Sequence, residues 1–522
     1  FHAQPTACPA CGPHVTLWDT EGRILSERDT ALHAAAEALR QGQILAVKGL
    51  GGFHLVADAR TEASVQRLRV RKHREEKPFA LMYPSLDVVK EDCDVSDREG
   101  LLLLSPECPI VLLSRKPGAH AVVEAVAPGS PRFGVMLPGN PLHHLLMEAL
   151  GFPIVATSGN LSEEPLCIDE HEALQRLRGI ADLFLVHNRP IVRHVDDSIV
   201  QMAAGREMVL RRARGYAPLP IRVNMNGPVT VAWGAHLKNT VAVAKQGHVF
   251  LSQHIGDLET PRAFDAFLEA ADALKRLYDA EPQQTACDLH PDYLASKHAR
   301  SLPLPRVEVQ HHYAHVLACM AEHGLDAPVL GVSWDGTGYG PDGTIWGGEF
   351  LRASMDGFER VGHLRTFRLP GGATAIKEPR RSALGMLFKI MGSCVEEQTT
   401  LPTVEAFTPT ERKALLQMLA REVNCPETSS MGRLFDAVAS LLGLYQQCSY
   451  EGQAAMALEY AARRHGACVP QVALQAAPVG ASWVLDWAPM INAILEARAK
   501  NAPVETIAAE FHAALAESIV TL

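Results

Sequence analysis

Hydrophobic and polar residues change their spacing repeatedly along the first part of the chain. Residues 31–39 place apolar side chains at helical intervals, and the apolar run at 44–49 predicts a buried strand. A second helical pattern covers 64–78, and apolar strands are expected at 79–84 and 152–160. Alternating helices and strands predict an α/β fold class for this part of the chain.

The pattern changes after a segment rich in Pro and Asn at 214–228, which we interpret as a domain boundary. Residues 229–252 then read as a meander of short strands joined by turns. Helical patterns dominate afterwards, apart from a strand and glycine-rich turn at 329–350. A chain of 522 residues is too long for one ordinary core, so two or three domains are expected.

Composition narrows the class of protein. Hydrophobic residues make up 47% and charged residues 21%, the balance of a folded protein. The formal net charge of −10 disfavours nucleic acid as a partner, and no apolar run is long enough to cross a bilayer. Nine of the eleven cysteines are scattered singly, which indicates reduced thiols. We therefore expect a cytoplasmic protein with neither a nucleic-acid nor a membrane partner.

A dense basic cluster supplies the first candidate site, and it comprises Arg69, Arg71, Lys72, His73, Arg74 and Lys77. Such a cluster can neutralise a triphosphate while pyrophosphate leaves, although a solvated helix face is the more ordinary explanation of the charges taken alone. Small residues at 156–160 end an apolar strand and can hold phosphate oxygens. Further cations follow at Arg189, Arg193, Arg211, Arg212 and Arg214.

A histidine pair supplies the second candidate site. His311 and His315 are four residues apart, so a helix would place both imidazoles on one face, as a metal site requires. Histidines with this spacing are more often ordinary surface or core residues, because two ligands rarely hold an ion. Asp335 lies where a strand meets a glycine-rich turn and would complete a set of ligands for zinc or iron, although turn chemistry alone also explains an Asp-Gly pair.

Weaker signals lie elsewhere in the chain. Cys8 and Cys11 form a CxxC pair, which is half of a tetrahedral zinc site. Three glycine-bearing segments are candidate nucleotide-binding turns or simply loops between elements: Gly234, Lys238 and Asn239; Gly432, Arg433 and Asp436; Glu451, Gly452 and Glu459.

Four motifs in the first part of the chain, KGLGGFHL, KHREEKP, TSGN and LRRARGYAP, together resemble the YrdC-like domain, whose members make carbamoyl-type adenylates from ATP. The resemblance implies that a site for ATP and a small acid is lined by Lys48, Lys72, Arg74, Lys77, Ser158 and Asn160. The free-standing YrdC proteins have other residues where this chain has Lys48 and Gly49, so the carbamoylated substrate is expected to differ.

The second part of the chain, with SQHIGDLET, DLHPDY and the glycine-bearing segments, resembles the TsaD-like domain of the actin and sugar-kinase superfamily. With CPACGP in front, the order of parts is similar to that of the HypF family of hydrogenase-maturation proteins. We expect a zinc-finger remnant at 1–25, a YrdC-like α/β domain with a twisted mixed sheet at 26–221, and a TsaD-like α/β domain at 222–522. The first and last residues look like cut ends, so a fragment is expected, with the last domain incomplete.

This resemblance implies an ATP-dependent carbamoyltransferase. In the family, carbamate released from carbamoyl phosphate is adenylated with ATP and Mg²⁺, and the carbamoyl group then passes to the C-terminal cysteine of HypE for cyanide synthesis in [NiFe]-hydrogenase. We expect Lys72, Arg74 and Lys77 to be catalytic. We also expect zinc or iron at His311, His315 and Asp335, and zinc at Cys8 and Cys11. Nucleotide binding is expected at Lys48, Ser158, Asn160, Arg211, Arg214, Gly234, Lys238, Gly432, Asp436 and Gly452.

Two other functions fit the same motifs. One is an enzyme that joins the two steps of threonylcarbamoyl-tRNA synthesis, because both domains have relatives there, although the acidic charge and CPACGP argue against it. The other is a non-catalytic scaffold that binds zinc and nucleotide.

Overall fold

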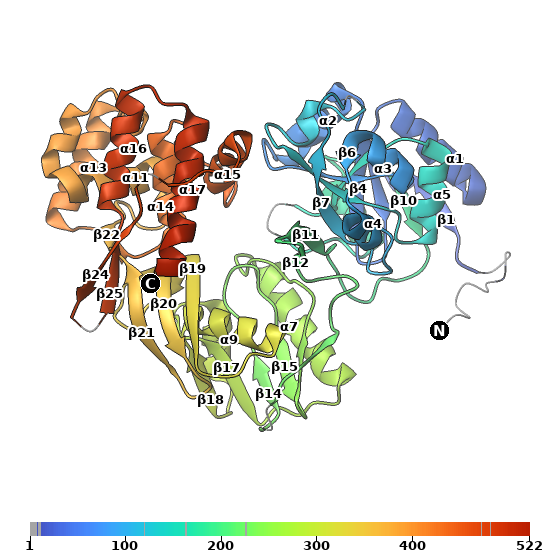
Figure 1. Ribbon diagram of the computed structural model, residues 1–522. Coiled ribbons are helices and arrows are strands. Elements are labelled where there is room, and N and C mark those ends of the chain that lie inside the picture. Colours follow the sequence, from blue (N-terminus) through green and yellow to red (C-terminus); the bar gives the residue numbers. More distant parts are fainter. Residues whose placement is uncertain are drawn as a thin grey trace. The chain divides into compact units, whose positions relative to one another are not determined.

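A computed structural model describes residues 8, 12–119, 121–161, 164–224, 227–470, 472–480 and 482–521 (Figure 1). Its internal contacts divide the chain into two compact units, and each is described by itself below. Unit 1 comprises 1–287 and 292–307, and unit 2 comprises 288–291 and 308–522. Among the described helices, none is long and apolar enough to cross a membrane.

A mixed sheet of twelve strands forms the first half of unit 1. Its order is β12-β11-β7-β8-β5-β9-β4-β3-β10-β1-β2, with β6 paired to β7. The pairs β3–β10, β5–β8 and β7–β11 are parallel and the others are antiparallel. The strands are β1 (Val15–Trp18), β2 (Ile24–Glu27), β3 (Leu45–Lys48), β4 (Phe53–Asp58), β5 (Ala80–Met82), β6 (Cys93–Asp94), β7 (Ile110–Arg115), β8 (Arg132–Met136), β9 (Ile154–Ser158), β10 (Leu183–His187), β11 (Ile199–Ala203) and β12 (Arg206–Arg211).

Helices cover both faces of this sheet, which explains why β3 is buried along its whole length. On one face α1 (Arg28–Arg40) and α5 (Pro141–Leu150) lie side by side and share a core with the sheet (Figure 1). The core on the other face includes residues of α2 (Glu62–Lys72), α3 (Leu86–Asp92), α4 (Asp97–Leu103) and α6 (Glu170–Leu177). The α/β character expected for this region is therefore confirmed.

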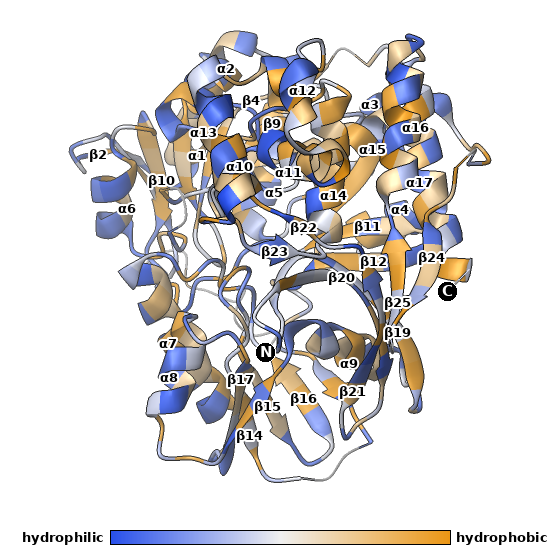
Figure 2. Cartoon of the chain, turned by 90° about the vertical axis from the view of Figure 1, so that its left-hand side faces the viewer, coloured by the Kyte–Doolittle hydropathy of each residue, from blue (hydrophilic) through white to orange (hydrophobic). Residues whose placement is uncertain are grey.

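The expected meander follows as a second sheet, in the order β13-β16-β15-β14-β17-β18. Its strands are β13 (Pro220–Arg222), β14 (Thr230–Ala232), β15 (Ala242–Lys245), β16 (His248–Leu251), β17 (Gln284–Asp288) and β18 (Arg306–Val309). Residues of α7 (Pro261–Leu277) and α8 (Leu294–Ser301) pack with β14 and β17 in one core. Hydrophilic and hydrophobic residues occupy different sides of these two helices, as Figure 2 shows.

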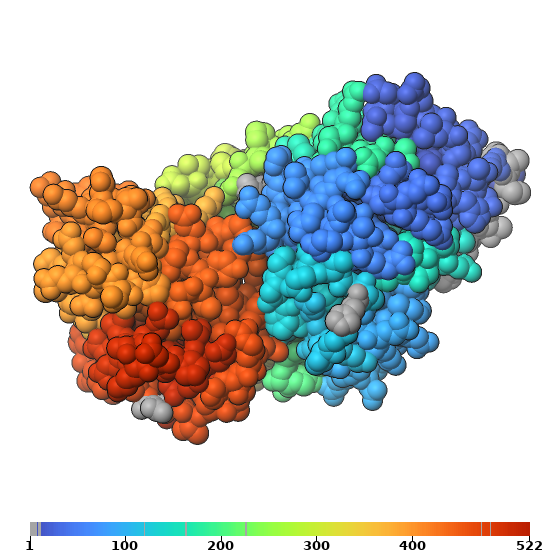
Figure 3. Space-filling view, turned by 90° about the horizontal axis from the view of Figure 1, so that it is seen from above, coloured from blue at the N-terminus to red at the C-terminus, as the bar shows by residue number. Residues whose placement is uncertain are grey.

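Unit 2 is built on a sheet in the order β22-β23-β20-β21-β25-β24, with β19 paired to β20. Its strands are β19 (Val329–Tyr339), β20 (Ile345–Ala353), β21 (Phe358–Leu364), β22 (Phe367–Arg368), β23 (Glu427–Thr428), β24 (Gln475–Val479) and β25 (Ser482–Asp486). Its helices are α9 (His311–His323), α10 (Thr374–Lys377), α11 (Pro379–Met391), α12 (Pro402–Glu405), α13 (Pro409–Arg421), α14 (Met431–Leu441), α15 (Gln453–His465), α16 (Ala488–Ala499) and α17 (Val504–Thr521). In Figure 3 the dark red residues of the C-terminal helices form one continuous surface.

Two local irregularities position the side chains discussed below. Helix α2 ends at Lys72, and the capping residue His73 has φ 51° in the left-handed region, so the chain turns sharply between Lys72 and Arg74. Asp335 was expected where a strand runs into a turn, but β19 continues past it with a register shift between Trp334 and Gly338. Gly338 has no room for a Cβ, since an added atom would lie 2.3 Å from the ring of His312. The glycine therefore allows the strand to continue against α9.

Candidate functional sites

Lys72 joins the basic cluster to the small-residue turn. It is the last residue of α2, and its side chain is 7% exposed. The ammonium donates to Ser158 O at 2.5 Å, to Asn160 O at 3.1 Å and to Asn160 Oδ1 at 3.0 Å. Ser158 Oγ also donates to Asn160 Oδ1 at 2.7 Å. Residues 86 and 88 positions apart in the sequence thus form one hydrogen-bonded group, in which the turn accepts all three ammonium protons.

Arg74 lies beside this group. Its Nη1 donates to Thr157 Oγ1 at 3.1 Å and its Nε to Lys77 O at 3.1 Å. Lys77 is exposed, and both cations act on Lys72 electrostatically. These three residues, which were expected to be catalytic, therefore lie close to one another and to the turn.

Two other members of the basic cluster, Arg69 and Arg71, bind groups of the fold rather than the turn at Ser158 and Asn160. Arg69 is 4% exposed and donates to the carbonyls of Arg74, Glu75 and Lys77, which fixes the loop after α2. Arg71 forms a salt bridge with Asp182 at 2.7 Å. The sequence alone does not separate these arginines from Lys72 and Arg74, because all four belong to one run of charges.

Burial is the main cause of an unusual pKa at Lys72. It lowers the pKa of this ammonium to about 7, and the positive charge of Arg74 acts in the same direction. A cation held in this way gains more from an anionic ligand than a solvated lysine does, because it has already lost its water. The group can therefore stabilise negative charge that develops close to Ser158 and Asn160.

The other expected nucleotide-binding residues of this sheet have different surroundings. Lys48 is fully buried and contacts Glu170 Oε2 at 2.5 Å and His187 O at 3.2 Å, so its charge is paired away from the turn. Arg214 contacts Asp197 Oδ1 at 2.8 Å. Arg211 ends β12. The structure does not bring these three residues into hydrogen-bonding contact with the Lys72 group.

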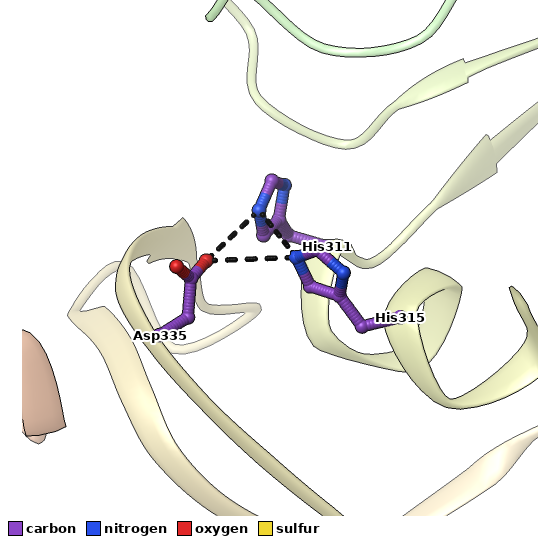
Figure 4. A group of neighbouring side chains, drawn as sticks. All are labelled: His311, His315 and Asp335. Carbon is purple, nitrogen blue, oxygen red and sulfur yellow. Dashed lines mark hydrogen bonds and ion pairs between the residues drawn. The ribbon is translucent and has the colours of Figure 1, made fainter. Parts of the chain in front are cut away.

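In unit 2, the ligand atoms of His311, His315 and Asp335 face a common point (Figure 4). His311 and His315 lie one turn apart on α9, and Asp335 comes from β19. The Nε2 atoms of the two histidines are 3.3 Å apart and lie 3.2 and 3.6 Å from Asp335 Oδ2. The three ligand atoms lie within 4.8 Å of one another, so these residues can bind one ion.

Asp288 is a further member of this site that the sequence did not reveal. It ends β17, and its Oδ2 lies 2.7 Å from His311 Nδ1. A carboxylate on the second nitrogen of a metal-binding histidine fixes the ring and its tautomer. The segment DLHPDY contains Asp288, but only the fold shows that its carboxylate reaches α9.

The ligand set fits a divalent metal such as zinc or iron. Burial by itself would lower the pKa of His311, but hydrogen bonds to Asp288 and Asp335 outweigh it and raise that pKa to about 9. Burial would raise the pKa of Asp335, yet the hydrogen bonds from His311, His315 and the Gly336 amide lower it. Both shifts show that the cluster concentrates negative potential where a cation would bind.

The glycine-bearing segments fall in both units. In unit 2, Gly432 packs against the strand that carries Asp335, since an added Cβ would lie 2.9 Å from Gly336 Cα. Asp436, on the same helix, pairs with Arg433 at 2.8 Å, and burial raises its pKa to about 6. Gly452 precedes α15 with φ 76°.

Gly234 and Lys238 belong to unit 1. Gly234 has φ +66°, and an added Cβ would lie 2.5 Å from Thr240 O, while the Lys238 amide donates to Asp257 at 2.7 Å. Of the expected zinc ligands near the N-terminus, Cys8 is exposed and Cys11 lies outside the described residues.

Family models match the chain in four segments. Residues 1–18 match the "HypF finger", and 37–213 match the Sua5, YciO and YrdC model described as "Telomere recombination". Residues 225–322 match the "HypF Kae1-like domain". Residues 331–522 match the "Carbamoyltransferase, Kae1-like Domain, second subdomain".

Relatives match over most of the chain. Carbamoyltransferase HypF of Synechocystis is 46% identical over 97% of this chain and 67% of its own length. Carbamoyltransferase HypF of Rhodobacter capsulatus is 44% identical over 88% of this chain and 61% of its own length. The chain thus spans between 61% and 67% of the length of these two relatives.

Solved structures agree with the sequence relatives. The crystal structure of full-length HypF in its phosphate- and nucleotide-bound form superposes with a TM-score of 0.92 at 42% identity, covering 98% of this chain and 66% of that one. The crystal structure of T. kodakarensis HypF gives a TM-score of 0.90 at 36% identity, covering 99% of this chain and 68% of that one. Finger, YrdC-like and Kae1-like segments therefore follow one another in the expected order. The chain belongs to the HypF carbamoyltransferase family.

Proposed function

We propose that this chain forms carbamoyl-adenylate from ATP and carbamate at the Lys72 group of unit 1. The observation that carries the proposal is the buried ammonium of Lys72 bound to the turn at Ser158 and Asn160. The phosphate- and nucleotide-bound state of a full-length HypF at 42% identity supports a nucleotide as ligand. The part of the relatives' length that this chain does not span would supply the carbamate from carbamoyl phosphate.

In this reaction a carbamate oxygen attacks the α-phosphorus of ATP. A new oxygen–phosphorus bond forms, the bond to the β-phosphate bridging oxygen breaks, and pyrophosphate leaves with that electron pair. Positive charge is therefore needed where pyrophosphate departs. Lys72 and Arg74 supply it close to the turn, and Mg²⁺ on the phosphates would add to it.

Activation has a clear chemical purpose, because carbamate itself is a poor acyl donor. Free carbamate would have to expel an oxide ion, whereas the adenylate expels AMP, which is a much better leaving group. A thiolate can therefore attack the carbonyl carbon of the adenylate. A carbon–sulfur bond forms, the carbon–oxygen bond to AMP breaks, and AMP leaves with the electron pair. We propose that unit 2 carries out this transfer to the C-terminal cysteine of HypE in the cytoplasm, as a step towards the cyanide ligand of [NiFe]-hydrogenase.

His311, His315 and Asp335 are the residues that would hold a metal in unit 2, either zinc or iron. A bound divalent ion would supply Lewis acidity at a carbonyl or phosphate oxygen. Asp288 holds the His311 ring in the orientation that turns Nε2 toward the other two ligands. The protein's own contribution is thus a fixed, partly buried ligand set.

The decisive experiment is mass spectrometry of the chain after incubation with ATP, Mg²⁺ and carbamate, with pyrophosphate measured in parallel. Carbamoyl-adenylate and equal pyrophosphate are expected. L-threonine with bicarbonate is the matched control substrate, and it should give no adenylate. Formation of threonylcarbamoyl-adenylate, or of no adenylate with either substrate, would overturn the proposal.

A further inference from the structure

Asp335 lies in an irregular part of its strand. The register of β19 against β20 shifts between Trp334 and Gly338, so residues 335–337 stand opposite Gly347. Such a bulge disrupts the regular ladder of backbone hydrogen bonds and redirects the side chains that it carries. Other contacts must therefore fix its shape if the carboxylate of Asp335 is to meet the two histidines of α9.

Two glycines of β20 let the neighbouring backbone approach this bulge closely. A Cβ on Gly347 would lie 2.6 Å from Asp335 O and 2.9 Å from Ser430 Cα. A Cβ on Gly348 would overlap Ser429 O. The bulge and the residues that lead into α14 therefore pack directly against the backbone of β20.

The carboxylate of Glu349 fixes this packing from within β20. The residue is fully buried, and its Oε1 accepts from the amides of Gly347 and Gly348 at 3.1 and 3.2 Å. The same oxygen accepts from Ser429 Oγ. Hydrogen bonds to an ionised acceptor are stronger than those between neutral groups, and more so in a buried site. One oxygen thus ties β20 to the segment that leads into α14.

Arg360 balances the charge of this buried carboxylate. Its Nε donates to Glu349 Oε2 at 2.6 Å, and its Nη1 lies 3.3 Å from Asp342 Oδ2. The guanidinium also lies over the ring of Trp346, with Cζ 4.0 Å from the ring centroid. A buried charge is tolerated when it is paired and hydrogen-bonded, and both oxygens of Glu349 meet this condition.

Ser430 connects this network to the bulge. Its Oγ donates to Gly336 O at 2.7 Å and lies 3.2 Å from Asp335 O, and the residue is also the N-cap of α14. Ser430 directly follows Ser429, whose hydroxyl binds Glu349. One short series of hydrogen bonds therefore joins the buried carboxylate to the backbone that carries the side chain of Asp335.

We infer that Glu349 positions the metal ligand Asp335, because it holds the bulge in the shape that turns this carboxylate toward the two histidines of α9 (Figure 4). Glu349 is a positioning residue and not a ligand, since the three ligand atoms belong to other side chains. A ligand that is already held in place loses less conformational freedom when the ion binds. The inference rests on the metal site proposed for unit 2 and is independent of the adenylation proposed for unit 1.

Equilibrium binding of Co²⁺ to the chain tests this inference without catalysis. Glu349→Gln keeps the shape of the side chain but removes its charge, so Arg360 loses its closest carboxylate and the affinity for Co²⁺ should fall about tenfold. The visible spectrum of bound Co²⁺ should also change, because it depends on the number and arrangement of the ligands. Glu378→Gln is the matched control, since Glu378 pairs with the buried Arg380 of the same unit, and it should change neither readout.

Ser430→Ala is a second variant that leaves the buried ion pair intact. It removes the hydroxyl that reaches the bulge, so the affinity for Co²⁺ should fall about threefold to tenfold. Ser440→Ala removes another buried hydroxyl, which bonds to Gln446, and it should bind Co²⁺ as the wild type does. Thermal unfolding of all four variants separates a weaker metal site from a loss of folded protein.

The outcomes are distinct. Wild-type affinity and spectrum in a folded Glu349→Gln would overturn the inference, and so would equal losses of affinity in the control variants. If Glu349→Gln does not fold, Ser430→Ala decides in the same way. If the wild type binds no Co²⁺, the metal site of unit 2 and this inference fail together, while carbamoyl-adenylate formation in unit 1 is measured separately and is judged by its own result.

Discussion

The Lys72 group in unit 1 and the histidine cluster in unit 2 are built on opposite electrostatic principles. Lys72 is a cation buried at the end of a helix, with its ammonium tied to neutral carbonyl and amide oxygens. His311 lies between two carboxylates, Asp288 and Asp335, and its pKa is raised. One site therefore favours an anion and the other favours a cation.

The difference shows how each site would be completed. Burial without a counter-ion lowers the pKa of Lys72 to about 7, and an incoming phosphate supplies the missing negative charge. In unit 2 the negative charge is already present, and an incoming metal replaces the shared protons. A substitution in each site should therefore remove a different ligand and leave the other site's ligand bound.

The largest expected effect is that of Lys72→Ala. Loss of this cation should reduce ATP–pyrophosphate exchange in the presence of carbamate by about 100- to 1,000-fold, the usual effect of removing one group that stabilises a developing charge. Arg71→Ala is the matched control, since Arg71 is the preceding residue and pairs with Asp182 instead. Its exchange rate should stay within about twofold, because exposed or half-exposed salt bridges contribute little. Normal exchange in Lys72→Ala would show that the two sites do not differ as described.

The double variant His311→Ala, His315→Ala tests the other side of the comparison. Two of three ligands are removed, so the metal content by elemental analysis should fall from about one ion per chain to below about 0.1, while carbamoyl-adenylate still forms. His323→Ala, an exposed histidine at the end of the same helix, should keep its metal. An unchanged metal content in the double variant would mean that these histidines are not ligands.

The two sites also differ in how far the sequence predicts them. His311 and His315 follow from helical spacing alone, because residues four apart share a face of α9. No local pattern links Lys72 to Ser158, since their contact depends on how α2 and β9 are placed by the sheet, and only the ordered family motifs suggested it. The α/β alternation of unit 1 was predictable because its strands are continuous apolar runs.

Side-chain contacts that depend on tertiary structure could not be predicted from the sequence patterns. Lys48 was expected among the nucleotide-binding residues, yet its ammonium forms a salt bridge with Glu170, which lies 122 positions away in the sequence. Asp288 Oδ2 lies 2.7 Å from His311 Nδ1, although the two residues are 23 positions apart and no local pattern links them. The same holds for His54 and Asp197, whose pairing spans 143 positions. In each case periodicity describes the element but not the partner of its side chain.

A smaller effect is expected for Asp288→Asn. The amide keeps the size of the side chain but removes the charge that fixes the His311 ring, so metal affinity should fall about 10- to 100-fold. Competition with a chelator of known affinity measures this change. Asp356→Asn, at an exposed position in the same unit, is the control and should leave the affinity unchanged. An unaltered metal affinity in Asp288→Asn would show that the charge of Asp288 does not contribute to metal binding.

The smallest expected effect is a proton taken up when nucleotide binds unit 1. In the free protein the pKa of Lys72 is about 7, so its ammonium is largely protonated at pH 6 and largely neutral at pH 8. A bound phosphate favours the charged form and raises this pKa, so binding at pH 8 takes up a proton, whereas binding at pH 6 does not. Affinity should then fall by up to about tenfold per pH unit above pH 7, until the pKa of the bound state is reached.

Calorimetry of a non-hydrolysable ATP analogue, in buffers of different ionisation enthalpy, measures the uptake of this proton. The phosphates of the ligand titrate as well, so Lys72→Gln serves as the reference, and the uptake at pH 8 should exceed that of the variant by nearly one proton. Equal uptake in both proteins would mean that the charge of Lys72 does not respond to the nucleotide, and the contrast with the histidine cluster would then rest on unit 2 alone.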